Sequence, residues 1–470
     1  MRPAAHRDRV GLCLAALAGA LLSLPGAPGG SALLPELRVL SVSEARADWL
    51  QPDASYREAQ FILRMAARDT AGHADDPGRL DSLGVALLRL GRMGQAEKIF
   101  RHVLDLSPRD ELAHGALGKL ALFNDRLAEA ESLLAGAEHA DPIAMNDLFA
   151  ARIRRGEYAA AAAMAAEVNQ EGRTELLKRM AEQPPYQITA GPKQAKLVWN
   201  RAYPVPLVRV KLNGQSVLMA LDTGANDLLL DESAARRCKV ERLPAQHAEF
   251  WCGARIAVKN AMVQRLEISG LKVEHIPAGI LSLHKWSLEV NPQSEAVVGV
   301  IGFNFFRRFT PTLDYKNQRL ELRQPEVAFV PGPDAERVPF EIWGESELTV
   351  YGSLAQSRRM ALVVQSGVPG CGVGAPTEVF DEIGVRPGIF SRATKGMGQF
   401  LHGRPWSAVT VASVTVGPIA KDKVAGWVGA LDASELWRHG VRRDALIAGD
   451  FFRGRRVTID WKGRELIFEE

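Results

Sequence analysis

The hydrophobic pattern divides the chain into two parts. From about 54 to 182, apolar residues, mainly Ala and Leu, recur with helical spacing, and Pro and Gly stand mostly at segment ends. From about 195 onward, short apolar runs such as 207–212 and 217–221 are separated by Gly, Pro and Asn. That second pattern is typical of strands joined by turns. The sequence therefore predicts an all-α region followed by a mainly-β region.

The helical part contains a repeat of 34 residues. Three positions recur at this offset, as Gly84 and Gly118, Ala96 and Ala130, and Pro108 and Pro142. Small residues let two helices approach closely, and Pro ends the second helix. The pattern resembles the tetratricopeptide repeat, which implies a short helical solenoid over 50–183. Such a region either binds a protein partner or packs as a spacer, and both readings stay open here.

The strongest local motif lies in the β part. An apolar run over 216–221 leads directly into Asp222-Thr223-Gly224-Ala225-Asn226-Asp227, and Val300-Ile301-Gly302 and Thr312-Leu313-Asp314-Tyr315 follow later. This order resembles one lobe of the retropepsin-like, or retroviral-type, aspartic proteases found in bacteria. The resemblance implies that Asp222, Thr223 and Gly224 form the catalytic loop. It also implies that Ala225, Asn226 and Asp227 line the substrate groove.

The motif returns in the last third of the chain. Gln365-Ser366-Gly367 repeats the loop at an offset of 143, and the later blocks repeat at 147 (Gly302 and Gly449) and 146 (Asp314 and Asp460). We therefore expect a double-lobed acid-protease fold, with lobe 1 over 195–325 and lobe 2 over 336–470. A proline-rich linker joins the two lobes.

Lobe 2 departs from the family pattern at the residue that matters most. Aspartic proteases use two carboxylates that share one proton, because two like charges a few ångströms apart cannot both ionise. Here Gln365 stands where the second Asp is expected. An amide can hydrogen-bond a water molecule, but it supplies no titrating proton.

Three arrangements follow from this departure. In the first, two chains pair through lobe 1 as a homodimer, two Asp222 complete the site, and the protein is an aspartic-type endopeptidase acting on peptides or proteins. In the second, the lobes pair within one chain and form a non-catalytic peptide-binding or scaffold protein, a pseudo-protease. In the third, Asp381 or Asp450 replaces the missing carboxylate.

A flap over the site is expected between the catalytic loop and the middle of lobe 1. Phe250, Trp251 and Gly253 are the candidates, since aromatic rings can cover a substrate and glycine can act as a hinge. The alternative is a hairpin packed on its own lobe. Cys238 and Cys252 could form a disulfide in an oxidising compartment, and Cys371 is expected to be a small buried residue.

Composition narrows the function further. The chain has 470 residues, 47% hydrophobic and 24% charged, with a net charge of +3. The hydrophobic content excludes a wholly disordered chain, and the charge balance gives no indication of nucleic-acid binding. Four cysteines are too few for a disulfide scaffold. The Cys and His spacings match no common zinc motif, so we expect no metal and no organic cofactor.

The N-terminus has the parts of a secretory signal. Arg2, Arg7 and Arg9 precede a largely apolar run over 10–24, which small residues follow. We expect a signal peptide over 1–32, with a cleavage site as late as 47, and export to the periplasm. The alternative is an uncleaved N-terminal anchor facing the periplasm. No later stretch of the sequence is long and apolar enough to span a membrane.

Overall fold

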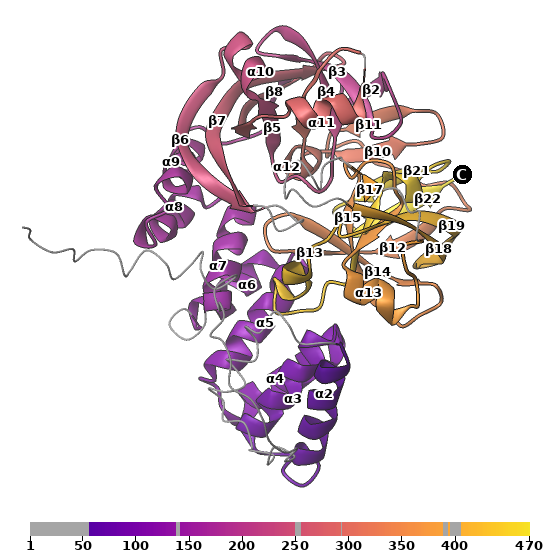
Figure 1. Ribbon diagram of the computed structural model, residues 1–470. Coiled ribbons are helices and arrows are strands. Elements are labelled where there is room, and N and C mark those ends of the chain that lie inside the picture. Colours follow the sequence, from indigo (N-terminus) through magenta and orange to yellow (C-terminus); the bar gives the residue numbers. More distant parts are fainter. Residues whose placement is uncertain (1–55, 138–141, 250–254, 293, 389–392, 395–405) are drawn as a thin grey trace, which may run out of the picture.

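The computed structural model describes residues 56–137, 142–249, 255–292, 294–388, 393–394 and 406–470 (Figure 1). The predicted signal segment and its cleavage sites lie outside these residues. Within the described ranges, the helices are all too short or too polar to serve as membrane spans.

The first part of the chain is helical, as predicted. Its helices are α2 (Tyr56–Thr70), α3 (Pro77–Arg89), α4 (Met93–Leu106), α5 (Glu111–Phe123), α6 (Leu127–Ala135), α7 (Pro142–Arg155), α8 (Tyr158–Glu167) and α9 (Glu171–Glu182). Each helix packs on the next along the chain. In Figure 1 they extend from α2 to α8 and α9, which lie beside lobe 1.

The 34-residue repeat has a visible packing basis. A Cβ atom on Gly84 would lie 2.7 Å from the Phe100 ring, and one on Gly118 would lie 2.6 Å from Leu134 Cγ. The glycines therefore admit a large apolar side chain from the following helix at equivalent places. Asp76 and Asp110, also 34 residues apart, cap α3 and α5 by accepting backbone N–H bonds. Assignment of this region to the tetratricopeptide repeats stays a prediction.

Lobe 1 is built around a sheet in the order β1-β8-β5-β9-β4-β3-β7-β6. Its strands are β1 (Gln187–Ala190), β3 (Leu207–Leu212), β4 (Gln215–Leu221), β5 (Leu228–Asp231), β6 (Glu241–Glu249), β7 (Arg255–Ile268), β8 (Leu271–Leu281) and β9 (Val297–Ile301). The short helices are α10 (Glu232–Arg237), α11 (His284–Val290) and α12 (Phe303–Phe306). Buried Val, Leu and Ile residues of these strands form the core, and β9 is buried at every position.

Lobe 2 repeats this arrangement, in the order β13-β14-β15-β20-β16-β19-β18-β17. Its strands are β13 (Glu341–Trp343), β14 (Glu347–Leu354), β15 (Met360–Gln365), β16 (Val373–Ala375), β17 (Ala393–Thr394), β18 (Trp406–Val416), β19 (Ile419–Val428) and β20 (Ala445–Ala448). Its helical turns are α13 (Thr377–Glu382), η1 (Ala433–Trp437) and η2 (Gly449–Phe451). The series β3-β4-β9-β5-β8 of lobe 1 matches β14-β15-β20-β16-β19, and β4 with β9, like β15 with β20, is a parallel pair.

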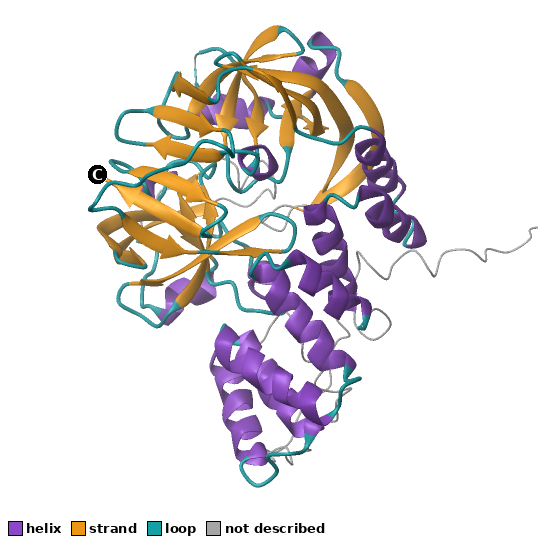
Figure 2. Cartoon of the chain, turned by 180° about the vertical axis from the view of Figure 1, so that it is seen from behind, coloured by secondary structure: helices purple, strands orange, loops and turns teal. Residues whose placement is uncertain are grey.

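A third sheet joins the lobes, in the order β12-β22-β21-β10-β11-β2. Lobe 1 contributes β2 (Gln194–Val198), β10 (Thr310–Asp314) and β11 (Arg319–Arg323), and lobe 2 contributes β12 (Glu336–Pro339), β21 (Arg456–Asp460) and β22 (Glu465–Glu469). At its centre Thr312 lies opposite Thr458, with the two hydroxyl oxygens 2.7 Å apart. The described residues thus form a helical region and a mainly-β acid-protease-like domain (Figure 2).

Candidate active site

Asp222 lies at the end of β4, where the backbone leaves the sheet. Its N–H donates to the carbonyl of Ile301 on the neighbouring parallel strand β9, at 3.0 Å. Its carboxylate oxygen Oδ1 accepts two further backbone N–H bonds, from Gly224 at 2.8 Å and from Gly367 of lobe 2 at 2.9 Å. Both loop glycines thus orient one carboxylate.

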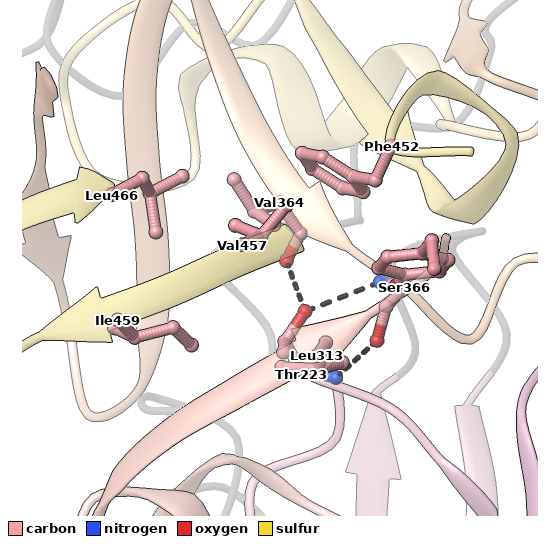
Figure 3. A pocket seen from close by; sticks show the side chains of 9 residues that line it. Thr223, Leu313, Val364, Ser366, Phe452, Val457, Ile459 and Leu466 are labelled. Atoms are coloured by element: carbon pink, nitrogen blue, oxygen red, sulfur yellow. Dashed lines mark hydrogen bonds between the residues drawn. The ribbon is translucent and has the colours of Figure 1, made fainter. Parts of the chain in front are cut away.

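The residues that follow lock the two loops together. The N–H of Thr223 donates to Ser366 Oγ at 3.0 Å, and the N–H of Ser366 donates to Thr223 Oγ1 at 3.2 Å. The Thr223 hydroxyl donates to the Val364 carbonyl at 3.1 Å (Figure 3). Because the two N–H bonds are reciprocal, the loops are related by an approximate twofold axis. Behind them a pocket of about 20 Å³ reaches the shared sheet.

Gln365 occupies the position that faces Asp222 across this axis. It is buried at the end of β15, and a Cβ atom on Gly224 would lie 2.8 Å from its Cδ. In the same way, a Cβ on Gly367 would lie 2.2 Å from Asp222 Cγ. Each side chain therefore rests on the glycine of the other lobe, where no other residue fits.

In this arrangement the Asp222 loop pairs with a loop of the same chain, and supply of the partner carboxylate by a second chain stays a prediction. The N–H and hydroxyl groups through which two lobe 1 loops would meet are bonded to lobe 2 of the same chain. The residue opposite Asp222 in the structure is Gln365. The physical reason is the shared sheet, which holds the two lobes of one chain together.

Burial and hydrogen bonding act in opposite directions on the Asp222 carboxyl. Burial raises its pKa above the ordinary value, and the N–H bonds from Gly224 and Gly367 lower the pKa in part. No negative charge is contributed by Gln365, which is neutral. The Gln365 Oε1 atom is buried and has no hydrogen-bond partner among the described residues.

The predicted groove residues are largely engaged by the protein itself. Asn226 is exposed, but its Oδ1 accepts a bond from the Ser346 hydroxyl at 2.5 Å. Asp227 Oδ1 accepts from the Tyr186 hydroxyl at 2.5 Å and from Asn304 at 3.0 Å, and burial raises its pKa. The Asp227 carboxylate thus joins segments of lobe 1 to each other, and the groove role of these residues stays a prediction.

The backbone of Ala225 has a structural task as well. Its side chain is buried, and its carbonyl accepts the Phe303 N–H at 2.7 Å, which fixes α12 to the catalytic loop.

Asp381 and Asp450, the two candidates to replace Gln365, each form an ion pair with an arginine. Asp381 is exposed on α13 and pairs with Arg386 at 3.2 Å. Asp450 follows Gly449 on η2 and pairs with Arg453 at 2.7 Å. The third arrangement, in which one of them replaces Gln365, therefore has no support from these contacts.

The candidate flap residues Phe250, Trp251 and Gly253 lie outside the described residues. The stem of that hairpin, β6 and β7, packs on α9, and the Asn260 amide of the stem donates to the Gly172 carbonyl at 2.8 Å.

The structure tests some of the predictions made for the three cysteines of the β part. Cys238 is buried, but Cys252 is outside the described residues, so their disulfide stays a prediction. Cys371 is buried as predicted, and burial raises the pKa of its thiol well above the ordinary value. In the part of the chain that the structure describes, no cluster of His, Cys, Asp or Glu could hold a metal ion.

A comparison with known protein families matches the segment that contains the Asp222 loop. Residues 208–308 match the family described as gag-polyprotein putative aspartyl protease. The match supports a protease-type function. The segment contains the Asp222 loop, β9 and α12, and so covers the core of lobe 1.

Other comparisons are more distant. No curated protein sequence matches the chain. Among solved structures, Basic 7S globulin from soybean is 10% identical, with a TM-score of 0.33, covering 60% of this chain and 95% of that one. A retropepsin-like aspartic protease from Rickettsia conorii is 13% identical, with a TM-score of 0.19, covering 29% of this chain and 92% of that one.

Proposed function

We propose that this protein hydrolyses peptide bonds at an Asp222–Gln365 pair formed within one chain. The observation that carries the proposal is the placement of the Gln365 amide opposite the Asp222 carboxylate across the interlocked loops. The family match over 208–308 supports peptide hydrolysis as the type of reaction. A homodimer is not needed for such a site.

The chemistry divides between the two side chains. Ionised Asp222 takes a proton from a water molecule while the water oxygen bonds to the peptide carbonyl carbon. The Gln365 N–H donates to the carbonyl oxygen as negative charge develops there, which is a role that Gln side chains fill in oxyanion sites. Protonated Asp222 then gives its proton to the leaving nitrogen as the C–N bond breaks. The Gly224 and Gly367 amides hold Asp222 Oδ1 in place during these steps.

The test is cleavage of a quenched-fluorescence peptide library, measured from acid to neutral pH. We expect the wild type to cleave, and Asp222→Asn and Gln365→Ala each to lose about 10²–10⁴-fold in rate. Gln365→Glu is the matched control, since it keeps the side-chain length but replaces the N–H donor with a carboxyl group. Wild-type activity that survives in Asp222→Asn would show that the site lies elsewhere.

One observation favours a second function, peptide binding without cleavage: the amide of Gln365 has no proton that titrates, so it cannot act as the second acid. On this proposal the chain binds peptides without cutting them. It is supported if the wild type binds library peptides but cleaves none, while Gln365→Asp gains cleavage.

Two further proposals rest on the sequence pattern alone. The 34-residue repeat supports a tetratricopeptide-like region over 50–183 that presents a protein substrate or partner to the β domain. The basic and apolar N-terminus supports export to the periplasm. Sedimentation with candidate partners tests the first, and fractionation of producing cells tests the second.

A further inference from the structure

We infer that the outer face of α2 binds the surface of a negatively charged membrane. The stripe on the helical region that forms this face shares no residue with the Asp222–Gln365 pair. The inference therefore goes beyond the proposed hydrolysis and does not rest on it. The face carries three arginines around one phenylalanine, and we call the four residues the α2 stripe: Arg57, Phe61, Arg64 and Arg68.

Helical spacing places the α2 stripe on one line along the helix. Its members are four, three and four positions apart, which at about 100° per residue keeps them within about 60° of the helix circumference. With a rise of about 1.5 Å per residue, the stripe is about 16 Å long from Arg57 to Arg68. The opposite side of α2 carries the buried Ala59 and Leu63, and α2 packs on α3. The stripe therefore points toward solvent.

The side chains of the α2 stripe are exposed, and its positive charge is unpaired. Phe61 is 48% exposed, although a phenylalanine ring is more commonly buried. None of the three guanidinium groups forms an ion pair or a hydrogen bond with a residue that the structure describes. The acidic residues of α2 lie off the stripe: Asp69 pairs with Arg79 of α3 at 2.7 Å, and Glu58 is on the flank of the helix. The stripe is thus a positive surface that includes an apolar ring.

The 34-residue repeat does not itself require an apolar residue at this place. At that offset Phe61 corresponds to Gln95 of α4 and to Glu129 of α6, which are both polar. Glu129 pairs with Arg126 at 3.0 Å. A partner that lay along the helices would meet these residues, and the negative Glu129 would not attract the same ligand as the arginines do. The positive and apolar surface is therefore confined to the first helix that the structure describes.

The shape of this surface favours a bilayer over an acidic peptide. A peptide gains affinity in a groove that contacts it on two sides, whereas the α2 stripe is the convex face of a single helix. A bilayer is flat, so its surface can contact all four side chains at once. The arginines then meet lipid phosphates, and the Phe61 ring enters the boundary between headgroups and acyl chains. In Figures 1 and 2, α2 to α4 project from the lobes at one end of the molecule, where a flat surface can approach them.

The test measures sedimentation of the full chain with lipid vesicles. One set of vesicles is phosphatidylcholine alone, and the other is phosphatidylcholine mixed with the anionic lipid phosphatidylglycerol. We expect binding to the anionic vesicles to be at least about tenfold tighter, because one arginine near such a surface contributes about fivefold. This binding should weaken as salt is added. Equal binding to the two sets of vesicles, or no binding to either, overturns the inference.

Two substitutions in the α2 stripe test its charge and its ring separately. Arg64→Glu replaces attraction by repulsion, and we expect about 25-fold weaker binding to anionic vesicles. Phe61→Ser removes the inserted ring and should weaken this binding about fivefold. All variants keep residues 1–55, so any binding by the apolar N-terminal run is common to them. Both residues are exposed, so the unfolding temperature should stay that of the wild type, and Arg68→Glu takes the place of a variant that fails to fold. Unchanged binding in the folded variants overturns the inference.

The control is a matched pair of residues on α11 of lobe 1. Lys285 is exposed, and Leu288 is 54% exposed. Lys285→Glu changes the net charge by as much as Arg64→Glu does, and Leu288→Ser removes an exposed apolar side chain. We expect both variants to bind anionic vesicles as the wild type does. A loss in Lys285→Glu as large as that in Arg64→Glu would mean that net charge governs the binding, which overturns the role of the stripe.

Polyglutamate, added as a soluble competitor, distinguishes an acidic protein segment from a bilayer. Retention of the wild type on anionic vesicles in its presence, together with the loss in Phe61→Ser, supports the bilayer. If polyglutamate releases the wild type while Phe61→Ser binds vesicles normally, the arginines bind acidic segments and the membrane inference fails.

Discussion

The Asp222 carboxyl is the one ionisable group of the catalytic loops, and its setting decides their chemistry. In a two-carboxylate site the second acid splits the titrations and supplies the proton. Here the raised pKa comes from burial, against two stabilising N–H bonds. The group must lose its proton before it can act as a base, and in doing so it places a charge in a buried site.

Activity and stability should therefore respond to pH in opposite directions. If Asp222 is the base, the hydrolysis rate rises with pH through its raised pKa. The folded state binds the Asp222 proton more tightly than the unfolded state does, so this group's contribution to stability falls as pH rises through the same range. Asp222→Asn removes the buried charge and keeps an acceptor for the two glycine N–H groups. We expect it to unfold at higher urea than the wild type at pH 7.

The comparison across pH separates this effect from other titrations. The difference in unfolding free energy between Asp222→Asn and the wild type should shrink as pH falls, and it levels off below the ordinary Asp pKa, where the wild-type group is protonated in both states. Urea unfolding of both proteins at several pH values measures it. A difference that is constant with pH would mean that the Asp222 pKa is not shifted.

The site also depends on the absence of a Cβ atom at Gly367. Gly367→Ala would place Cβ 2.2 Å from Asp222 Cγ, so the carboxylate or the loop has to move. We expect a loss of about 1–3 kcal/mol in the free energy of unfolding, together with loss of the reaction. Gly94→Ala on α4 is the control, because nothing lies within 4 Å of its added Cβ. It should be neutral or stabilising by about 0.5–1 kcal/mol; equal losses in both variants would contradict the packing argument.

Among the helices, α5 and α7 are held together by a buried ion pair. Lys119 donates to Asp147, both side chains are almost fully buried, and Lys119 also lies over the Phe123 ring at 5.7 Å. An ion pair in this setting mainly fixes which surfaces meet, because desolvation offsets much of its attraction. Removal of one partner alone should destabilise the fold, since the charge of the other partner stays buried without compensation.

A double-mutant cycle tests this account of the α5–α7 contact. Asp147→Leu leaves the Lys119 charge uncompensated, and we expect it to cost about 3–5 kcal/mol in the free energy of unfolding. Lys119→Met combined with Asp147→Leu should recover most of that loss, because apolar residues of similar size replace both charges. Chemical unfolding of the two single variants and the double variant gives the coupling energy. Additive losses would show that the pair does not act as a unit.

Elements with a local signal could be predicted from the sequence. Helical spacing predicted the first part of the chain, and the Asp222 loop with its downstream blocks predicted an acid-protease-like β domain. The partner of that loop could not be predicted, because the Asp-Thr-Gly signal is the same whether the opposite loop comes from another chain or from lobe 2. The contact that joins the two lobes, Thr312 opposite Thr458, depends on pairing of strands 146 residues apart. The bond from Ser346 to Asn226 likewise has no sequence signal, since it joins separate elements through two ordinary polar residues.

Taken as a whole, the molecule is held together by more than the shared sheet. The helical region contributes to the packing of both lobes: Trp343, Ala361 and Val441 of lobe 2 belong to the apolar cluster of α3 to α5, and Met262 of lobe 1 belongs to that of α8 and α9. Figures 1 and 2 show the helices lying along both lobes. The region is therefore part of one packed body in which movement of either lobe would disturb the helices.

Trp343 offers the most direct test of this coupling. It is fully buried and stacks on Phe123 of α5 with the ring centroids 4.9 Å apart. Trp343→Ala should cost about 3–5 kcal/mol, and the loss falls on the contact between helices and lobe 2. We expect the wild type to unfold in one calorimetric transition and Trp343→Ala to unfold in two, with the helical region unfolding first.

The matched control is Trp461→Ala, which removes an indole that packs against Phe303 and Phe340 inside the β domain. It should lower the transition temperature of the β domain without uncoupling the helices. If Trp343→Ala lowers the temperature of one undivided transition, the ion pair of Asp125 with Arg307 of lobe 1 and the bonds from Arg154 to backbone carbonyls of lobe 2 are sufficient to couple the two parts. If the wild type already shows two transitions, the helical region is an independent domain that unfolds separately from the β domain.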